Sequence, residues 1–111
     1  MPLPVVPWMT RVDRLILEVL DEAVITAVPP RAIVLELRER YGIDAPSESQ
    51  INRRLRTELT DHGLVHQPHS DEVRGYYAIT TLGERFLHDS DAEPEEFIDD
   101  IGGTPDDERP N

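Results

Sequence analysis

The chain has 111 residues, which is enough for one domain with a single modest core. It contains no cysteine, which excludes disulfides, a thiolate metal site and a thiol nucleophile. No apolar run approaches the roughly 20 residues of a membrane span, and the N-terminus lacks the basic region of a signal peptide. We therefore expect a soluble, cytoplasmic protein without membrane contact.

The net charge of −12 is distributed unevenly along the chain. Residues 1–88 carry ten arginines and thirteen acidic side chains, whereas residues 89–111 carry one arginine and ten acidic side chains. All 11 basic residues are arginine. High acidity without lysine is typical of proteins kept soluble in molar salt, although a GC-rich coding sequence would also replace lysine by arginine. We favour the saline interpretation.

The first predicted helix spans residues 11–23. Residues 1–9 form an extended arm, because their three prolines exclude regular helix. Thr10 and Asp13 have the spacing of a capping box, and we expect Trp8 to pack on the first turn. The apolar stripe that would face the core is Val12, Leu15, Ile16, Val19 and Leu20. The predicted solvent side is Asp13, Arg14, Glu18, Asp21 and Glu22.

A second helix is predicted over residues 30–41. The β-branched connector 24–28 precedes it, with a short strand as one interpretation, and Pro30 favours a helix start. Gly42 ends the helix. A link of only three residues, 43–45, then leads to another helical segment, an arrangement typical of a helix-turn-helix.

The third predicted helix, residues 47–62, has strong local signals at both ends. Ser47 and Gln50 have the spacing of a capping box, and Gly63 stands where a left-handed helix end is expected. The apolar residues recur every four positions and would line one face: Ile51, Leu55 and Leu59.

After Gly63 the sequence predicts a β-hairpin. Residues 64–67 and 76–80 are predicted as its two strands, and the polar stretch 68–75, the predicted wing, joins them. A short last helix follows over residues 81–88. Three helices followed by a two-stranded wing indicate a winged helix over residues 10–88.

The composition changes at Asp89. Residues 89–111 are acidic, with few apolar side chains, so we expect a mostly disordered tail. Within it, Phe97, Ile98 and Ile101 lie close together on a predicted short helix near 94–101. They would dock on the body, on a dimer partner or on another protein, and we favour the body or the dimer.

Polar side chains of the third helix are the strongest functional signal. Gln, Asn and Arg pair with adenine and guanine edges in the major groove, and Arg74 beside the hairpin tip suits a phosphate or the minor groove. The alternative is that the arginines pair within the chain, with Glu36 or Glu58. The predicted DNA-binding residues are Ser49, Gln50, Asn52, Arg53, Arg54, Arg56 and Arg74.

The sequence gives no sign of a metal site or of catalysis. His66 and His69 straddle a proline, but a metal site needs three or four converging ligands. There is no glycine-rich phosphate loop and no nucleophile elbow. We therefore predict a protein that is not an enzyme and that needs no metal or cofactor.

Six stretches of the chain form an ordered series: WMTRVDRLILEVL, VPPRAIVLEL, SQINRRLRTEL, DHGLV, GYYAITTLGERFL and HDSDAE. This series, over about residues 8–92, resembles the phage phi-H repressor-like family of halophilic archaea. The most specific parts are Trp8-Met9-Thr10, Asn52-Arg53-Arg54-Leu55, Gly63-Leu64-Val65 and Tyr77-Ala78-Ile79-Thr80 followed by Gly83. The resemblance implies a small winged-helix regulator that binds a roughly palindromic DNA site as a dimer, without a cofactor.

Two features depart from the family pattern. Leu55 and Leu59 are four residues apart where we expect the family's leucines to be three apart. The additional residue would rotate the end of the helix or introduce a bulge. The wing is also longer and more acidic than a strong phosphate clamp.

The sequence thus predicts a mainly α-helical winged helix-turn-helix protein with a two-stranded wing and a short C-terminal helix. We expect a homodimeric, sequence-specific transcriptional regulator, a repressor, whose partner is double-stranded DNA. Residues 47–62 would read the major groove, and no small-molecule substrate is expected. Two alternatives are a winged-helix adaptor between proteins that does not bind DNA, and a DNA mimic whose acidic tail binds a basic partner.

Overall fold

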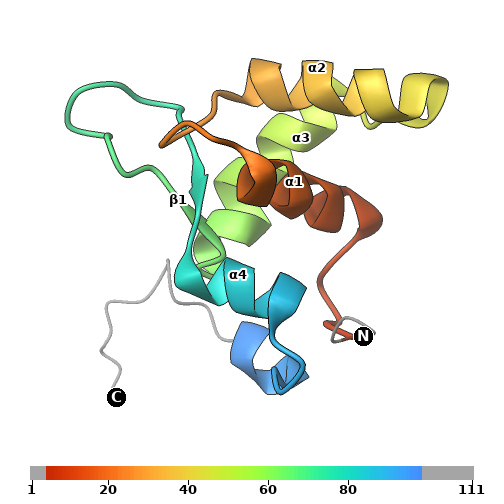
Figure 1. Cartoon of the computed structure of the whole chain (residues 1–111), viewed down its shortest axis with the longest axis vertical. Helices are drawn as coiled ribbons and strands as arrows, with labels where there is room; N and C mark the ends of the chain where they lie inside the picture. Colours follow the sequence, from red (N-terminus) through yellow and green to blue (C-terminus); the bar gives the residue numbers. More distant parts are fainter. Residues whose placement is uncertain (1–4, 99–111) are drawn as a thin grey trace.

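The computed structural model describes residues 5–98 of the chain, and residues 1–4 and 99–111 lie outside the description. Within residues 5–98 the chain is mainly helical, with four α-helices and a two-stranded antiparallel sheet (Figure 1). The elements are α1 (Arg11–Glu22), α2 (Pro30–Tyr41), α3 (Glu48–Arg54), β1 (Val65–His66), β2 (Ala78–Ile79) and α4 (Thr81–His88).

The core lies where α1, α2 and α3 pack against one another, with the sheet and α4 against α1. The predicted stripe of α1 faces this core, except that Val12 is only half-buried. Leu17 is also fully buried although it lies off the stripe, because α1 contacts β2 and α4 as well as the other two helices. The fully buried aliphatic side chains are Ile16, Leu17, Ile33, Val34, Leu37, Ile51, Leu55, Leu59, Leu64 and Val65.

Local signals at the helix ends are confirmed. Both capping boxes are formed, at Thr10 with Asp13 and at Ser47 with Gln50. Gly63 has a φ of 78°, the left-handed conformation that ends a helix. The predicted solvent position of Asp13 is wrong, because its side chain is completely buried.

The third helix changes its winding partway along. It is α-helical over Glu48–Arg54 and then forms a π-turn over Leu55–Leu59. The Thr60 hydroxyl donates to the Leu55 carbonyl, at 2.5 Å. A π-turn accommodates one additional residue, so Leu55 and Leu59 both remain buried. Of the two outcomes expected from the leucine spacing, a rotated helix end or a bulge, the structure has the bulge.

The sheet is shorter than predicted. Val65 pairs with Ile79 and His66 with Ala78. An isolated bridge between Val28 and Tyr77, with reciprocal hydrogen bonds of 2.7 and 2.8 Å, is the only strand-like pairing of the 24–28 connector. The long loop between the strands projects away from the body (Figure 1). This arrangement is compatible with a winged helix.

The first ten residues of the predicted tail, 89–98, are described and lie beside α4 (Figure 1). Pro94–Phe97 forms a 3-10 turn, and Phe97 is fully buried with its ring edge-on to Phe86 at 5.5 Å. Ile98 is exposed, and Ile101 lies outside the described residues.

We predict that Gly83→Ala destabilises the protein. A Cβ at this buried helix position would lie 2.5 Å from Ile79 Cγ1 and 2.6 Å from the Leu64 carbonyl oxygen. The backbone oxygen cannot turn aside, so the strand and helix must separate, at a cost of about 1–3 kcal/mol. Urea denaturation measures this difference. Glu84→Ala, at an exposed neighbouring position, is the control and should change stability by less than about 0.5 kcal/mol. Equal stability of the two variants would contradict the close packing.

Candidate nucleic-acid interface

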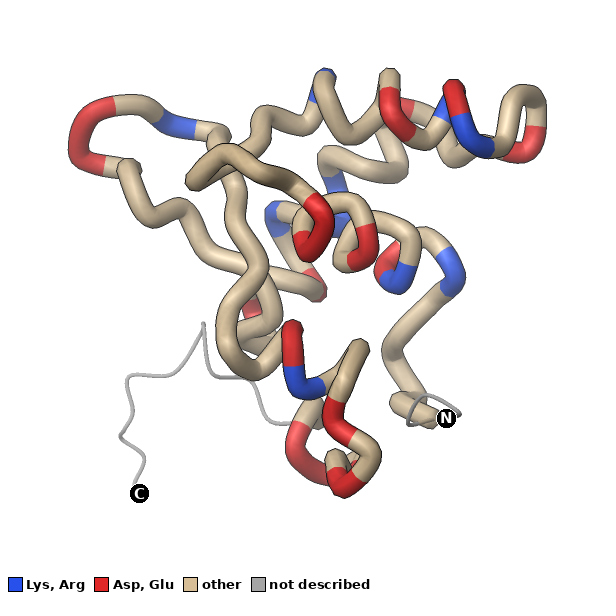
Figure 2. Tube along the Cα trace, in the orientation of Figure 1, with Lys and Arg blue, Asp and Glu red and all other residues tan. Residues whose placement is uncertain are grey.

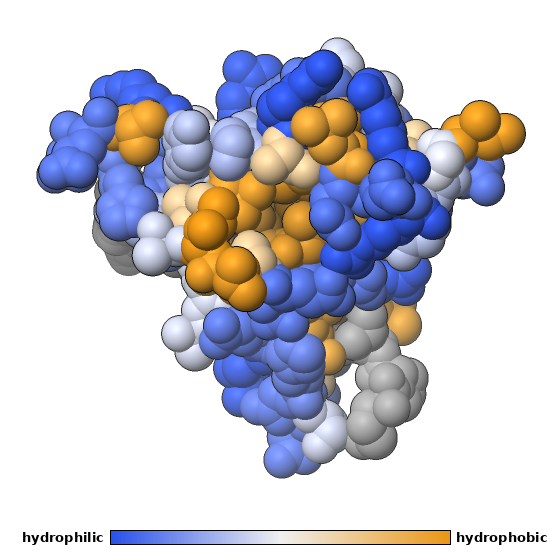
Figure 3. Space-filling view, turned by 45° about the horizontal axis from the view of Figure 1, so that its top comes forward, coloured by the Kyte–Doolittle hydropathy of each residue, from blue (hydrophilic) through white to orange (hydrophobic). Residues whose placement is uncertain are grey.

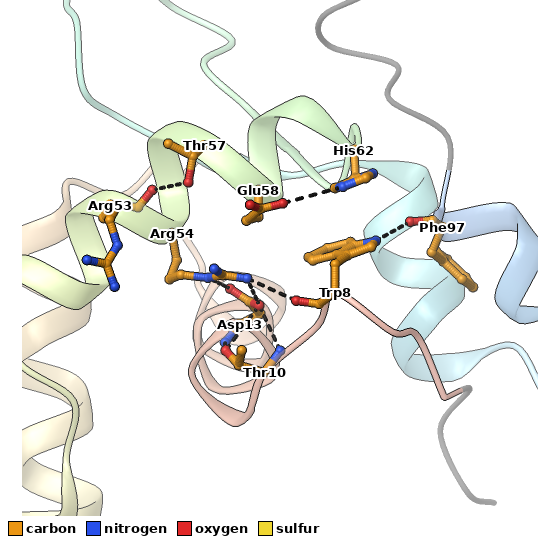
Figure 4. A network of polar contacts seen from close by, with 9 residues as sticks. All are labelled: Trp8, Thr10, Asp13, Arg53, Arg54, Thr57, Glu58, His62 and Phe97. Carbon is orange, nitrogen blue, oxygen red and sulfur yellow. Dashed lines mark hydrogen bonds and ion pairs between the residues drawn. The ribbon is translucent and has the colours of Figure 1, made fainter.

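Four predicted side chains share an exposed face at the third helix. We call this set the arginine face: Ser49, Gln50, Arg53 and Arg56, all of them exposed. In Figure 4 the Arg53 guanidinium points away from the polar network that surrounds Arg54. Arg53 and Arg56 have no carboxylate partner among residues 5–98. Their positive charges therefore face solvent without local neutralisation.

Most other arginines of the described chain are held by acidic or aromatic partners. Arg31 pairs with Glu48 at 2.6 Å, and Arg11 lies over the ring of Tyr41. Carboxylates also hold Arg14, Arg40, Arg54 and Arg85. Over residues 5–98, the arginines left without such a partner are Arg38, Arg53, Arg56 and Arg74.

Arg54 lies apart from the arginine face. Its Nε and one terminal nitrogen donate to the two carboxylate oxygens of Asp13 at 2.8 and 2.7 Å. The same terminal nitrogen donates to the Trp8 carbonyl at 3.1 Å. The hydrogen bond to Asp13 raises the pKa of Arg54 above its usual value. Because its side chain is only 17% exposed, Arg54 is engaged inside the protein and is not turned toward a ligand.

The two amide side chains differ in how they are held. The Gln50 carbonyl oxygen accepts the Ser47 backbone N–H at 3.1 Å, which fixes Gln50 at the start of α3. The Asn52 amide donates to the Glu48 carbonyl at 3.1 Å, and Asn52 is half-buried. Gln50 is exposed and belongs to the arginine face. Asn52 is less exposed, and its amide is hydrogen-bonded to the backbone of its own helix.

One residue of the arginine face, Arg56, interacts electrostatically with Tyr77. Burial raises the pKa of Tyr77, and the positive charge of Arg56 partly opposes this shift. Tyr77 directly precedes β2, where the chain returns from the wing. The charge of Arg56 therefore acts on a residue at the base of the wing.

The wing, residues 68–75, has an acidic tip (Figure 2). Asp71 and Glu72 are exposed there, and Arg74 is exposed on the returning strand side. His69 of the wing makes a 3.0 Å hydrogen bond with the Thr26 hydroxyl, which ties the wing to the α1–α2 connector. Arg74 also lines an open hollow of about 570 Å³ with His66 and Thr60. The wing thus offers one cation next to two carboxylates.

The described residues contain neither a metal-ligand cluster nor a helix that could span a membrane. No group of three or more His, Asp or Glu side chains in residues 5–98 is placed to hold a metal ion. The ring of His69 makes a hydrogen bond with the Thr26 hydroxyl. No helix in this range is long and apolar enough to cross a membrane.

The sequence analysis did not predict the contact between Trp8 and His62. Their rings stack with centroids 4.2 Å apart and planes 7° from parallel (Figure 4). Trp8 therefore packs on the end of the third helix. The two residues are 54 positions apart, and no periodic pattern connects them.

We predict that Arg54→Ala destabilises the fold by about 3–5 kcal/mol, because it leaves the buried Asp13 carboxylate without its cation. Chemical denaturation measures the effect, and Arg53→Ala is the exposed control with a change below about 0.5 kcal/mol. The double variant Arg54→Ala/Asp13→Asn removes the unpaired charge and should be more stable than Arg54→Ala alone. A double variant no more stable than the single one would show that the unpaired charge is not the cause.

Comparison of the chain with protein-family models, with curated proteins and with solved structures gives no match. No relative therefore lends this chain an activity or a partner. The functional conclusion depends on the geometry of the arginine face, the wing and the surfaces beside them.

Proposed function

We propose that this protein is a winged helix-turn-helix transcriptional regulator, a repressor, that binds double-stranded DNA. The observation that carries the proposal is the set of arginines without carboxylate partners at the third helix and the wing, in a protein of net charge −12. The order of α2, a short turn, α3 and a hairpin supports it, as does the resemblance to the phi-H repressor-like family.

Each of the predicted DNA-binding residues has a distinct role in this proposal. Arg53 and Arg56 reach guanine edges or phosphates in the major groove. Ser49 and Gln50, at the start of α3, contact bases or backbone nearby. Arg74 reaches a phosphate or the minor groove from the wing. Arg54 contributes by holding the helix in position and not by touching DNA, and Asn52 has a minor role because its amide is engaged.

The charge distribution favours specific over non-specific binding. Few cations contact DNA, and the carboxylates of Asp71 and Glu72 stand at the wing tip. A protein that neutralises few phosphates gains little from counterion release and loses little affinity as salt rises. Base contacts and DNA shape must then supply most of the affinity, which suits a protein that works in molar salt.

An apolar patch supports the homodimer. We define it by two exposed side chains that line one hollow, Val24 at 99% and Ile25 at 59% exposure. Figure 3 shows apolar residues gathered around a hollow on this side of the molecule. The hollow, about 360 Å³, is lined by Val24, Ile25 and Ala32 among others. A projecting side chain beside a hollow is self-complementary, as a twofold contact requires.

The charges around this patch are compatible with a second copy. Arg40 lies between Glu22 and Glu36 and pairs with both. The charges at the edge of the patch are therefore partly neutralised. Acidic surface elsewhere on the protein would repel the same surface of an identical partner. Exposed apolar residues that cluster in this way mark an interaction site.

The same patch also supports the second candidate, an adaptor that binds another protein. Its apolar side chains suit either partner, and a −12 protein with an acidic wing tip gains little from DNA electrostatics. The two candidates differ at the arginine face. An adaptor that works through the patch would not need Arg53 or Arg56.

Selection from a random duplex DNA pool in molar KCl tests the DNA proposal. The protein should recover an inverted repeat, and Arg53→Ala/Arg56→Ala should lose at least about tenfold in affinity for it, since one guanine contact accounts for about 1–3 kcal/mol. Arg38→Ala removes another exposed arginine without a carboxylate partner, on α2, and is the matched control. Its affinity should match that of the unaltered protein.

Two results would reject this proposal. The first is no enrichment of any sequence by a correctly folded sample. The second is equal loss of affinity in Arg38→Ala and in Arg53→Ala/Arg56→Ala, which would indicate only general electrostatic attraction.

We predict that Val24→Asp converts the dimer to a monomer in sedimentation velocity, because the twofold contact would bury two unpaired carboxylates. Ile43→Asp is the matched control, since Ile43 is 101% exposed but lies in the turn after α2, outside the patch. It should sediment like the unaltered protein. A dimer that survives Val24→Asp, or one that only Ile43→Asp disrupts, would place the dimer contact elsewhere.

A further inference from the structure

A chain of contacts connects the segment Glu93–Ile98 to the third helix through Trp8 (Figure 4). The Trp8 indole N–H donates to the Phe97 carbonyl at 2.6 Å. The Trp8 ring stacks on His62, and the Trp8 carbonyl accepts from Arg54 at 3.1 Å. One residue of the N-terminal arm thus contacts the C-terminal segment and two points on the third helix.

The C-terminal segment is anchored on α4 by its own contacts. Phe97 is fully buried against Phe86. Arg85 donates to both carboxylate oxygens of Glu96 at 2.8 Å. The backbone N–H of Glu93 and the Arg85 guanidinium together lower the pKa of Glu96. The position of the Phe97 carbonyl, which receives the Trp8 donor, is therefore fixed when the segment is docked.

Trp8 contacts the third helix on either side of its least regular part. The π-turn Leu55–Leu59 lies between Arg54 and His62, and π-turns are rare in helices and frequent at functional sites. Arg56 of the arginine face lies within this turn. The direction of the Arg56 side chain therefore depends on how the helix is held on both sides of the turn, by Arg54 before it and by His62 after it.

Docking of the segment opposes a local repulsion between carboxylates. Residues 89–96 include Asp89, Asp91, Glu93, Glu95 and Glu96, and Arg85 is the cation that contacts this cluster. Like charges at this spacing favour separation. A short 3-10 turn held by one aromatic ring and one arginine is the kind of element that opens locally while the remainder stays folded.

We propose that the segment Glu93–Ile98 regulates the DNA interface: when docked, it holds the π-turn and Arg56 in the binding geometry through Trp8 and His62, and when released, it lets them move. This inference rests on the proposed function. Binding at either site must then favour the other, because a coupling between two sites is reciprocal. DNA would strengthen docking of the segment, and a ligand that captures the released segment would weaken DNA binding.

The experiment compares full-length variants that release the segment with a matched control. Phe97→Ala removes the buried anchor. Trp8→Phe keeps an aromatic ring against His62 but removes the indole donor. Ile98→Ala is the control, because Ile98 adjoins Phe97 and is 45% exposed. The readouts are amide hydrogen exchange of residues 55–62, fluorescence of Trp8, the single tryptophan of the chain, and affinity for the selected DNA site.

We expect Phe97→Ala to shift the Trp8 emission to the red and to accelerate exchange at residues 55–62, while exchange in α2 stays unchanged. DNA affinity should fall about tenfold, within the usual range of such couplings. Trp8→Phe should show the same acceleration and a similar loss of affinity. Ile98→Ala should behave as the unaltered protein in all three measurements.

The inference is overturned if the Trp8 emission shifts in Phe97→Ala while exchange at residues 55–62 stays unchanged, because the segment would then be released without effect on the helix. Unchanged affinity in both release variants would also overturn it. Exchange and fluorescence need no DNA, so absence of DNA binding by the unaltered protein would reject the proposed function separately. Should Phe97→Ala unfold globally, Trp8→Phe decides the outcome through exchange and affinity.

Discussion

The buried ion pair of Asp13 and Arg54 is the interaction on which the remaining geometry depends. The Asp13 carboxylate accepts the backbone N–H of Thr10 at 2.9 Å as well as both Arg54 donors. One side chain therefore caps the start of α1 and binds the end of α3. A buried carboxylate is tolerated only when its oxygens are satisfied in this way. Arg54 is drawn inward by this pair, whereas its neighbours on the same helix, Arg53 and Arg56, are exposed.

The π-turn is the second constraint on the arginine face. Ile51, Leu55 and Leu59 must all reach the core, yet an α-helix advances about 100° per residue and drifts away from an every-fourth repeat. Wider winding over Leu55–Leu59 corrects this drift and keeps each of the three side chains fully buried. Arg56 lies within this turn, and its charge acts on Tyr77 at the base of the wing. Core packing thus shapes the part of the helix that carries Arg56.

Local signals predicted the helices well, and non-local contacts account for what was missed. The capping residues Thr10 and Ser47 and the glycine at 63 act within a few positions, so the sequence alone placed these helix ends. The partner of Arg54 is 41 positions away, and that of Trp8 is 89 positions away. Periodicity assigns Asp13 to the solvent side of α1, because nothing nearby in the sequence indicates a cation folded over it. The exposed arginines were predicted for their residue type, whereas the structure separates those that are engaged from those that are not.

The resulting surface explains how an acidic protein can present cations to DNA. Two carboxylates of the third helix have partners of their own: Glu48 pairs with Arg31 at 2.6 Å, and Glu58 lies 3.5 Å from the His62 ring. Were they unoccupied, either could swing toward Arg53 or Arg56 and cancel its charge. Pairing elsewhere thus keeps the face positive, while the remaining acidic surface disfavours contact with DNA in any other orientation. In the proposed regulator, the excess of negative charge would therefore limit non-specific binding and leave recognition to the few arginines that the fold holds apart from carboxylates.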